Sequence, residues 1–218
     1  METNENKITD PTEKAGTAEV ALNGAANRKY ISTIVGVGVM TAVVVVLQLL
    51  SSVIHFGPFS ITLALTAIIV GGAVYGIWAG AWLGFAMAMT VLLSGDAAAF
   101  MTINALGTIL TVIGKSTVAG LLASLVYKLI EKKSRFGAVI AAGVTAPVVN
   151  TGIFLIGVYL FFYQTVSEWA VGSDLPVGEY IFTGLIGLNF PVELMVNLAL
   201  STVTVTIIGI VKRSMAER

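Results

Sequence analysis

Long apolar segments constrain the fold of this chain more than any other feature. A helix needs about 20 residues to cross the hydrocarbon core of a bilayer, and five apolar blocks of the sequence reach that length. They are residues 31–54, 60–94, 102–127, 137–163 and 181–211. Only 11% of the residues are charged, whereas charged residues make up about 25% of a soluble domain. The pattern predicts an all-α membrane protein, and the alternating segments of a membrane β-barrel do not occur in the sequence.

The basic residues predict how many times the chain crosses the membrane. All but one of the 12 lysines and arginines fall in three clusters, within residues 1–29, 128–135 and 212–218. Cytoplasmic loops of membrane proteins are enriched in lysine and arginine, so all three clusters are expected on the cytoplasmic side. An even number of spans must then separate the first two clusters, and residues 60–94 are expected to form a helical hairpin that turns at Tyr75-Gly76. The chain is therefore predicted to have six transmembrane helices, with both termini in the cytoplasm.

Composition divides the chain into three parts and excludes several kinds of chemistry. Residues 1–29 are polar and of mixed charge, and we expect a flexible cytoplasmic tail there. Residues 30–213 should form the six-helix domain in the plasma membrane, and residues 214–218 a short cytoplasmic end. The chain has no cysteine and one histidine, so neither a disulfide bond nor a structural zinc site is expected. We likewise expect no metal, no cofactor and no nucleic-acid partner.

The remaining basic residue, Lys115, is the strongest candidate for a functional residue. It lies inside the block at residues 102–127, where an ammonium costs about 2.5–3.5 kcal/mol on insertion scales. Glu193 and Asn150 lie at a similar depth in two other predicted helices if the rise is about 1.5 Å per residue. Three polar groups from three helices are therefore expected to meet near the middle of the membrane.

Polar residues recur at helical spacing around these three positions. Residues four apart lie on one face of a helix, and lipid offers no hydrogen bonds, so these faces should point inward. The predicted substrate contacts on these faces are Lys115, Asn150, Asn189, Glu193, Asn104 and Thr108. Two other interpretations remain open, namely a buried structural pair of Lys115 and Glu193, and a relay for protons or ions.

The sequence contains no complete nucleotide-binding motif. Gly114-Lys115-Ser116 matches the end of a phosphate-binding loop, but Ile109 occupies the position of the required first glycine. We therefore expect no ATPase activity and no catalytic residue in this chain. If transport uses ATP, another subunit must hydrolyse it.

Several short sequence features occur in an order that is typical of one transporter family. They are residues 47–50, 55–59, 70–76, 114–120, 146–151 and 189–193. With these features and six short predicted helices, residues 30–213 resemble the substrate-binding S component of an energy-coupling factor (ECF) vitamin transporter. The resemblance implies that the chain captures a vitamin from outside, docks on a transmembrane coupling protein and two cytosolic ATPases, and topples in the membrane to release the vitamin inside. It also implies that the loop after the first helix covers the bound vitamin, which makes His55 and Phe56 predicted substrate contacts. The small residues Gly38 and Ala42 are then expected to contact the coupling protein.

The polar residues favour a small hydroxylated carboxylate as the vitamin. A carboxylate would pair with Lys115, while amide and hydroxyl groups would bond to Asn150 and Asn189, so pantothenate is the expected substrate. Hydroxymethylpyrimidine and riboflavin are alternatives within the same family. A stand-alone proton-coupled transporter that uses Lys115 and Glu193, and an assembly protein that binds no small molecule, are alternatives outside it.

Overall fold

The computed structural model describes residues 11–53, 55–56, 59–60, 63–187 and 189–217. In this part of the chain the fold is all-α apart from one pair of two-residue strands, which confirms the predicted fold class at that level. In chain order the elements are α1 (Pro11–Val53), β1 (His55–Phe56), β2 (Phe59–Ser60), α2 (Ala64–Tyr75), α3 (Ile77–Ser94), α4 (Ala98–Met101), α5 (Ala105–Ile130), α6 (Arg135–Gly157), η1 (Val158–Phe162), α7 (Tyr163–Gly172), α8 (Val177–Tyr180), η2 (Ile181–Ile186), α9 (Asn189–Ala199) and α10 (Ser201–Ala216). The segments η1 and η2 are π-helical.

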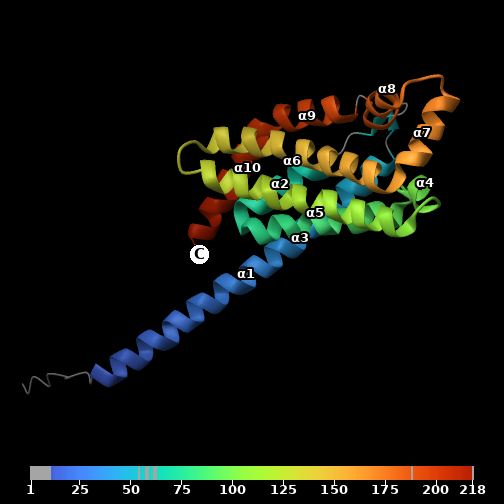
Figure 1. Ribbon diagram of the computed structural model, residues 1–218. Coiled ribbons are helices and arrows are strands. Elements are labelled where there is room, and N and C mark those ends of the chain that lie inside the picture. Colours follow the sequence, from blue (N-terminus) through green and yellow to red (C-terminus); the bar gives the residue numbers. More distant parts are fainter. Residues whose placement is uncertain (1–10, 54, 57–58, 61–62, 188, 218) are drawn as a thin grey trace, which may run out of the picture.

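Helix α5 is the central helix of an elongated bundle (Figure 1). It packs along α3 and along α6, while α1 and α2 both pack against α3. Helix α9 contacts α6, and α10 contacts both α6 and α2. The short helices α4, α7 and α8 gather at one end of the bundle, and α1 projects beyond the other end, where the C-terminus lies (Figure 1).

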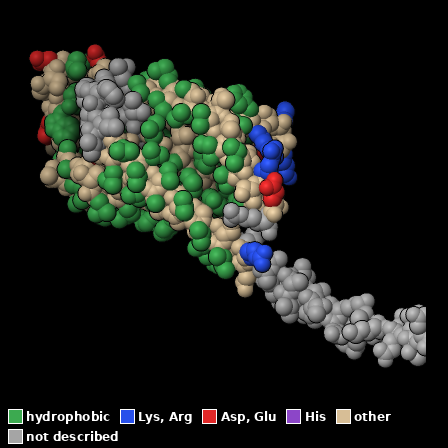
Figure 2. All heavy atoms as spheres, turned by 180° about the vertical axis from the view of Figure 1, so that it is seen from behind, with side chains coloured by type: hydrophobic (Ala, Val, Ile, Leu, Met, Phe, Trp, Pro, Cys, Tyr) green, Lys and Arg blue, Asp and Glu red, His purple; other side chains and the backbone are tan. Residues whose placement is uncertain are grey.

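Apolar side chains cover the flank of the bundle, while charges gather at its two ends (Figure 2). Lys and Arg lie at the end from which α1 projects, and most of the visible Asp and Glu lie at the opposite end. Among the described residues, four helical stretches are long and apolar enough to cross a membrane: Tyr30–Ser52, Ile77–Ser94, Ala105–Ile130 and Arg135–Gly172. Val177–Ile186 and Asn189–Ala199 make a fifth if the two form one bent span. This is the surface of a helical membrane protein, with apolar side chains for lipid and charged ends for water.

The hairpin predicted within residues 60–94 is present and turns at Gly76. This residue alone separates α2 from α3, and its φ angle is 105°. Residues with a Cβ rarely adopt that backbone conformation, so glycine makes the turn possible. A Cβ at Gly72 in α2 would lie 3.4 Å from the Cα of Gly80 in α3, so the two helices also approach closely beyond the turn.

Helix α1 begins well before the first apolar block. Residues from Pro11 onward are helical, where a flexible tail is expected over residues 1–29. The sequence Asp10-Pro11-Thr12-Glu13 has the features of a helix start, with an acidic residue before proline and a glutamate three positions later. Residues 1–10 lie outside the described part of the chain, and the cytoplasmic location of the whole segment stays a prediction.

The last apolar block, residues 181–211, is not one continuous helix. It divides into η2, α9 and α10, and the chain bends by 43° between Val177–Ile186 and Asn189–Ala199. Gly187 lies at this bend with a φ angle of 52°, a region that favours glycine. The depth of Glu193 therefore cannot be read from a uniform helical rise along the block, although Glu193 is buried.

Candidate functional site

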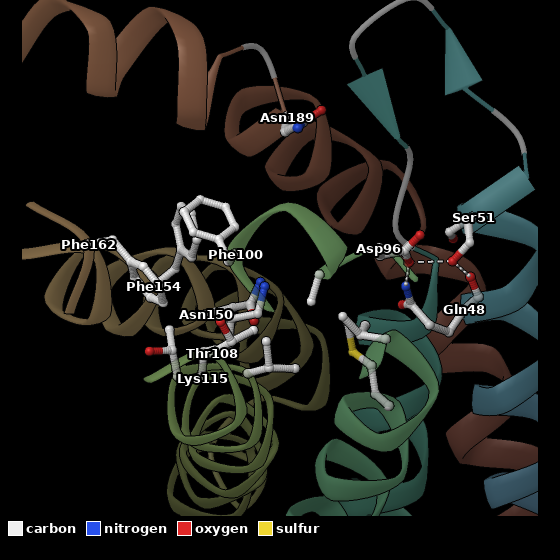
Figure 3. Close-up of a pocket in the computed structure, with 16 residues that line it drawn as sticks. Gln48, Ser51, Asp96, Phe100, Thr108, Lys115, Asn150, Phe154, Phe162 and Asn189 are labelled. Carbon is white, nitrogen blue, oxygen red and sulfur yellow. Dashed lines mark hydrogen bonds between the residues drawn. The ribbon is translucent and has the colours of Figure 1, made fainter. Parts of the chain in front are cut away.

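A cavity of about 360 Å³ lies in the half of the bundle that carries α4 (Figure 3). Side chains from α1, α3, α4, α5, α6, η1 and α9 line it, so distant parts of the sequence contribute. A second cavity of about 190 Å³ shares Lys115, Asn150, Phe154 and Asn189 with the first and is also lined by Glu193. Because they share four residues, the two spaces form one candidate site.

Most of the polar residues predicted as substrate contacts meet at this site. Thr108 and Lys115 come from α5, Asn150 comes from α6, and Asn189 begins α9; all four line the larger cavity. Thr108, Lys115 and Asn150 lie close together, with Asn189 on the other side of the space (Figure 3). Lys115, Asn150 and Glu193, which are expected to meet, all line the smaller cavity, while the role of these residues in binding stays a prediction.

Lys115 lies beside the aromatic ring of Phe154. Its Nζ is 5.4 Å from the centre of the Phe154 ring, within the range of about 6 Å for a cation–π contact. Since Lys115 lines both cavities, an anionic group in either space can reach it.

Two buried amide oxygens at the site have no hydrogen-bond partner among the described residues. They are Oδ1 of Asn150 and Oε1 of Gln48, and both residues line the larger cavity. Asn150 is 9% exposed and Gln48 is 5% exposed. A buried acceptor that stays unpaired costs about 1–3 kcal/mol, so a ligand that donates hydrogen bonds here would be stabilised.

The sequence reasoning missed the acidic end of the larger cavity. Asp96 follows α3, and its Oδ2 accepts hydrogen bonds from Nε2 of Gln48 at 3.4 Å and from Oγ of Ser52 (Figure 3). Ser51 lines the same end. A glutamine within the apolar block at residues 31–54, and an acid between two apolar blocks, are the sequence signals that point to it.

Three phenylalanines form an apolar wall of the larger cavity. They are Phe100 of α4, Phe154 of α6 and Phe162 of η1. The ring of Phe100 lies 5.9 Å from that of Phe154 and 5.0 Å from that of Phe162, in edge-to-face geometry. Such pairs contribute about 0.5–1.5 kcal/mol each beyond their buried area. The wall suits an aliphatic part of a ligand.

Asn104, another predicted ligand contact, has a structural role at the start of α5. It is the N-cap residue of α5, and its Oδ1 accepts a hydrogen bond from the Gly107 N–H at 2.9 Å. It lines neither of the two cavities. The first N–H groups of a helix lack partners within the helix, and asparagine is among the residues that satisfy them best. Capping of α5 therefore accounts for a polar residue at this position, at helical spacing from Thr108.

The structure does not test the other predicted contacts. The backbone of His55 pairs with Ser60 and that of Phe56 with Phe59, but the side chains of His55 and Phe56 lie outside what the structure describes. Gly38 and Ala42 lie on an exposed face of α1, and a Cβ at Gly38 would meet no described atom within 4 Å. Their contact with a coupling protein stays a prediction.

Comparison with known proteins adds no assignment, because no family model, curated protein or solved structure matches this chain. Among the described residues, no group of three or more His, Asp or Glu side chains is placed to hold a metal ion. The site offers one ammonium, carboxylates, amides and hydroxyls beside an apolar wall. These groups suit the binding of a small polar molecule through charge and hydrogen bonds.

Proposed function

We propose that this chain is the substrate-capture S component of an ECF-type vitamin importer in the plasma membrane. It binds a small water-soluble vitamin that carries a carboxylate, with pantothenate as the first candidate. The vitamin is released inside after the chain docks on a coupling protein and two cytosolic ATPases and topples in the membrane.

The observation that carries the proposal is the polar cavity of about 360 Å³ within an apolar bundle. Ligand pockets range from about 300 to 1,000 Å³, so a cavity of this size suits a small ligand. Lys115 provides a cation for a carboxylate, and Asn150 provides an unpaired buried acceptor for an amide or hydroxyl. The order of local sequence features over residues 30–213 supports the same family.

The proposal includes six membrane spans with both termini in the cytoplasm. The turn at Gly76 supports it by dividing one long apolar block into two helices, and the separation of basic from acidic side chains supports it further (Figure 2). Helix α2 has 12 residues, which is about 18 Å at 1.5 Å per residue. That is shorter than the hydrocarbon core of a bilayer, about 30 Å, and most residues of α2 are buried against neighbouring helices.

A Gly38→Leu change tests whether α1 is the coupling face. We expect this variant to bind pantothenate normally, because Gly38 lies outside both cavities, but to lose co-purification with the coupling module. The bulky side chain would prevent close approach of a partner helix. Val46→Leu, at another exposed position of α1, is the matched control. Normal complex assembly and transport by the Gly38→Leu variant would remove this face of α1 as the contact.

A stand-alone proton-coupled transporter is the second candidate, because Lys115 and Glu193 line the same smaller cavity. Liposomes that contain only the purified chain separate the two proposals. We expect binding of radiolabelled pantothenate but no accumulation, with or without a proton gradient. Accumulation driven by the gradient in the absence of ATPase subunits would favour the proton-coupled transporter.

A further inference from the structure

The larger cavity has two chemically different ends. Lys115 lies on the side formed by α5 and α6, and Asp96 and Gln48 lie on the side formed by α1 and the end of α3 (Figure 3). The Lys115 end therefore offers a positive charge, and the Asp96 end offers acceptors and a negative charge.

The protein satisfies the acceptor end only in part. Asp96 accepts hydrogen bonds from Gln48 and Ser52 through Oδ2. Oε1 of Gln48 has no partner among the described residues, although Gln48 is 5% exposed and lines the cavity. Buried amide oxygens are nearly always hydrogen-bonded, so a ligand that reaches this end has to supply a donor.

We infer that the ligand is bifunctional, with an anionic group at Lys115 and hydroxyl or ammonium donors at Asp96 and Gln48. This rests on the proposed function and adds the chemical class of the substrate. Phe100 and Phe154 lie in the wall of the same cavity and pack against the aliphatic linker between the two groups. A ligand that is anionic at both ends is rejected, because Asp96 repels its second charge.

Three ligands test the contribution of each end of the cavity to binding. Pantothenate carries both the carboxylate and two hydroxyls; pantothenol replaces the carboxylate with an alcohol; a dideoxy analogue of pantothenate lacks both hydroxyls. Binding of each to the purified chain in detergent is measured by titration calorimetry. We expect the wild-type protein to bind pantothenate at least tenfold more tightly than either analogue. An analogue with an amine in place of a hydroxyl then distinguishes ammonium from hydroxyl donors.

The Asp96→Asn variant assigns the acceptor end. It keeps the size of the side chain, and we expect pantothenate binding to weaken about tenfold while binding of the dideoxy analogue changes less than threefold. Asp174→Asn is the matched control, since Asp174 lies outside both cavities and asparagine tolerates its φ angle of 54°. The melting temperature of each variant reports on folding.

The outcomes distinguish this inference from the proposed function. If Asp96→Asn binds all three probes as the wild type does, the bifunctional ligand is wrong and the capture function stands. If none of the probes binds, the small molecule that co-purifies with the wild-type chain is identified. A compound that lacks either the anionic group or the hydroxyl or ammonium donors overturns the inference but leaves the capture function in place, and a compound that carries both supports the inference. If no compound co-purifies and no probe binds, both the inference and the capture function are wrong.

Discussion

The Lys115→Met variant is expected to bind pantothenate more than tenfold more weakly than the wild type while remaining folded. Methionine keeps an unbranched apolar side chain but removes the ammonium, which lines both cavities. A tenfold loss corresponds to about 1.4 kcal/mol, close to the lower end of the roughly 1.5–3 kcal/mol that a hydrogen bond to a charged group contributes. Titration calorimetry on the purified chain measures the affinity, and the melting temperature in the same detergent reports on folding.

Lys132→Met is the control, because Lys132 is exposed in the connection between α5 and α6. It removes the same charge from the chain and should leave affinity unchanged. Normal binding by Lys115→Met would make Lys115 irrelevant to the ligand. Failure of that variant to fold would instead favour the buried structural pair, since removing the lysine leaves Glu193 buried without its counter-charge.

The Gly80→Leu variant is expected to prevent the bundle from folding, and Gly80→Ala to lower its melting temperature. A Cβ at Gly80 would lie 2.7 Å from the carbonyl oxygen of Gly120 and 2.9 Å from Cβ of Ser124, both in α5. Backbone cannot move aside cheaply at that distance, and overpacking of a core costs about 1–3 kcal/mol for added methylene groups. Small residues at such crossings are what allow membrane helices to pack closely.

Gly152→Ala is the matched substitution for Gly80→Ala. Gly152 also lies inside a helix, but a Cβ there would meet no described atom within 4 Å. Both changes gain the same helix propensity, about 1 kcal/mol. The difference between the two melting temperatures therefore reports the cost of the steric clash at Gly80. Thermal unfolding in detergent, followed by circular dichroism, measures the melting temperature of each variant. Equal melting temperatures for the two variants would mean that α3 and α5 do not pack through Gly80.

Local sequence rules predicted the parts of the fold that local chemistry determines. The turn at Gly76 was predictable because a single apolar block was too long for one span and contained a glycine at its middle. The convergence of Lys115, Asn150 and Glu193 on the smaller cavity was predictable because polar residues at helical spacing in an apolar helix must face other helices.

The missed features depend on how helices pack or on backbone conformation. Asp96 and Gln48 are 48 positions apart in sequence, so only the packing of α1 against α3 reveals their contact. Asn104 lies at helical spacing from Thr108, but α5 begins at Ala105, so Asn104 caps the helix. The bend at Gly187 was not predicted, because a hydropathy pattern contains no information about a positive φ angle.

Native mass spectrometry of the purified chain tests the capture of a small vitamin most directly. We predict that the wild-type protein, released from mild detergent, carries one small molecule whose mass matches a water-soluble vitamin with a carboxylate, and that Lys115→Met has lost it. A protein that carries no small molecule, and that binds none when a panel of water-soluble vitamins is added, would contradict the proposed function.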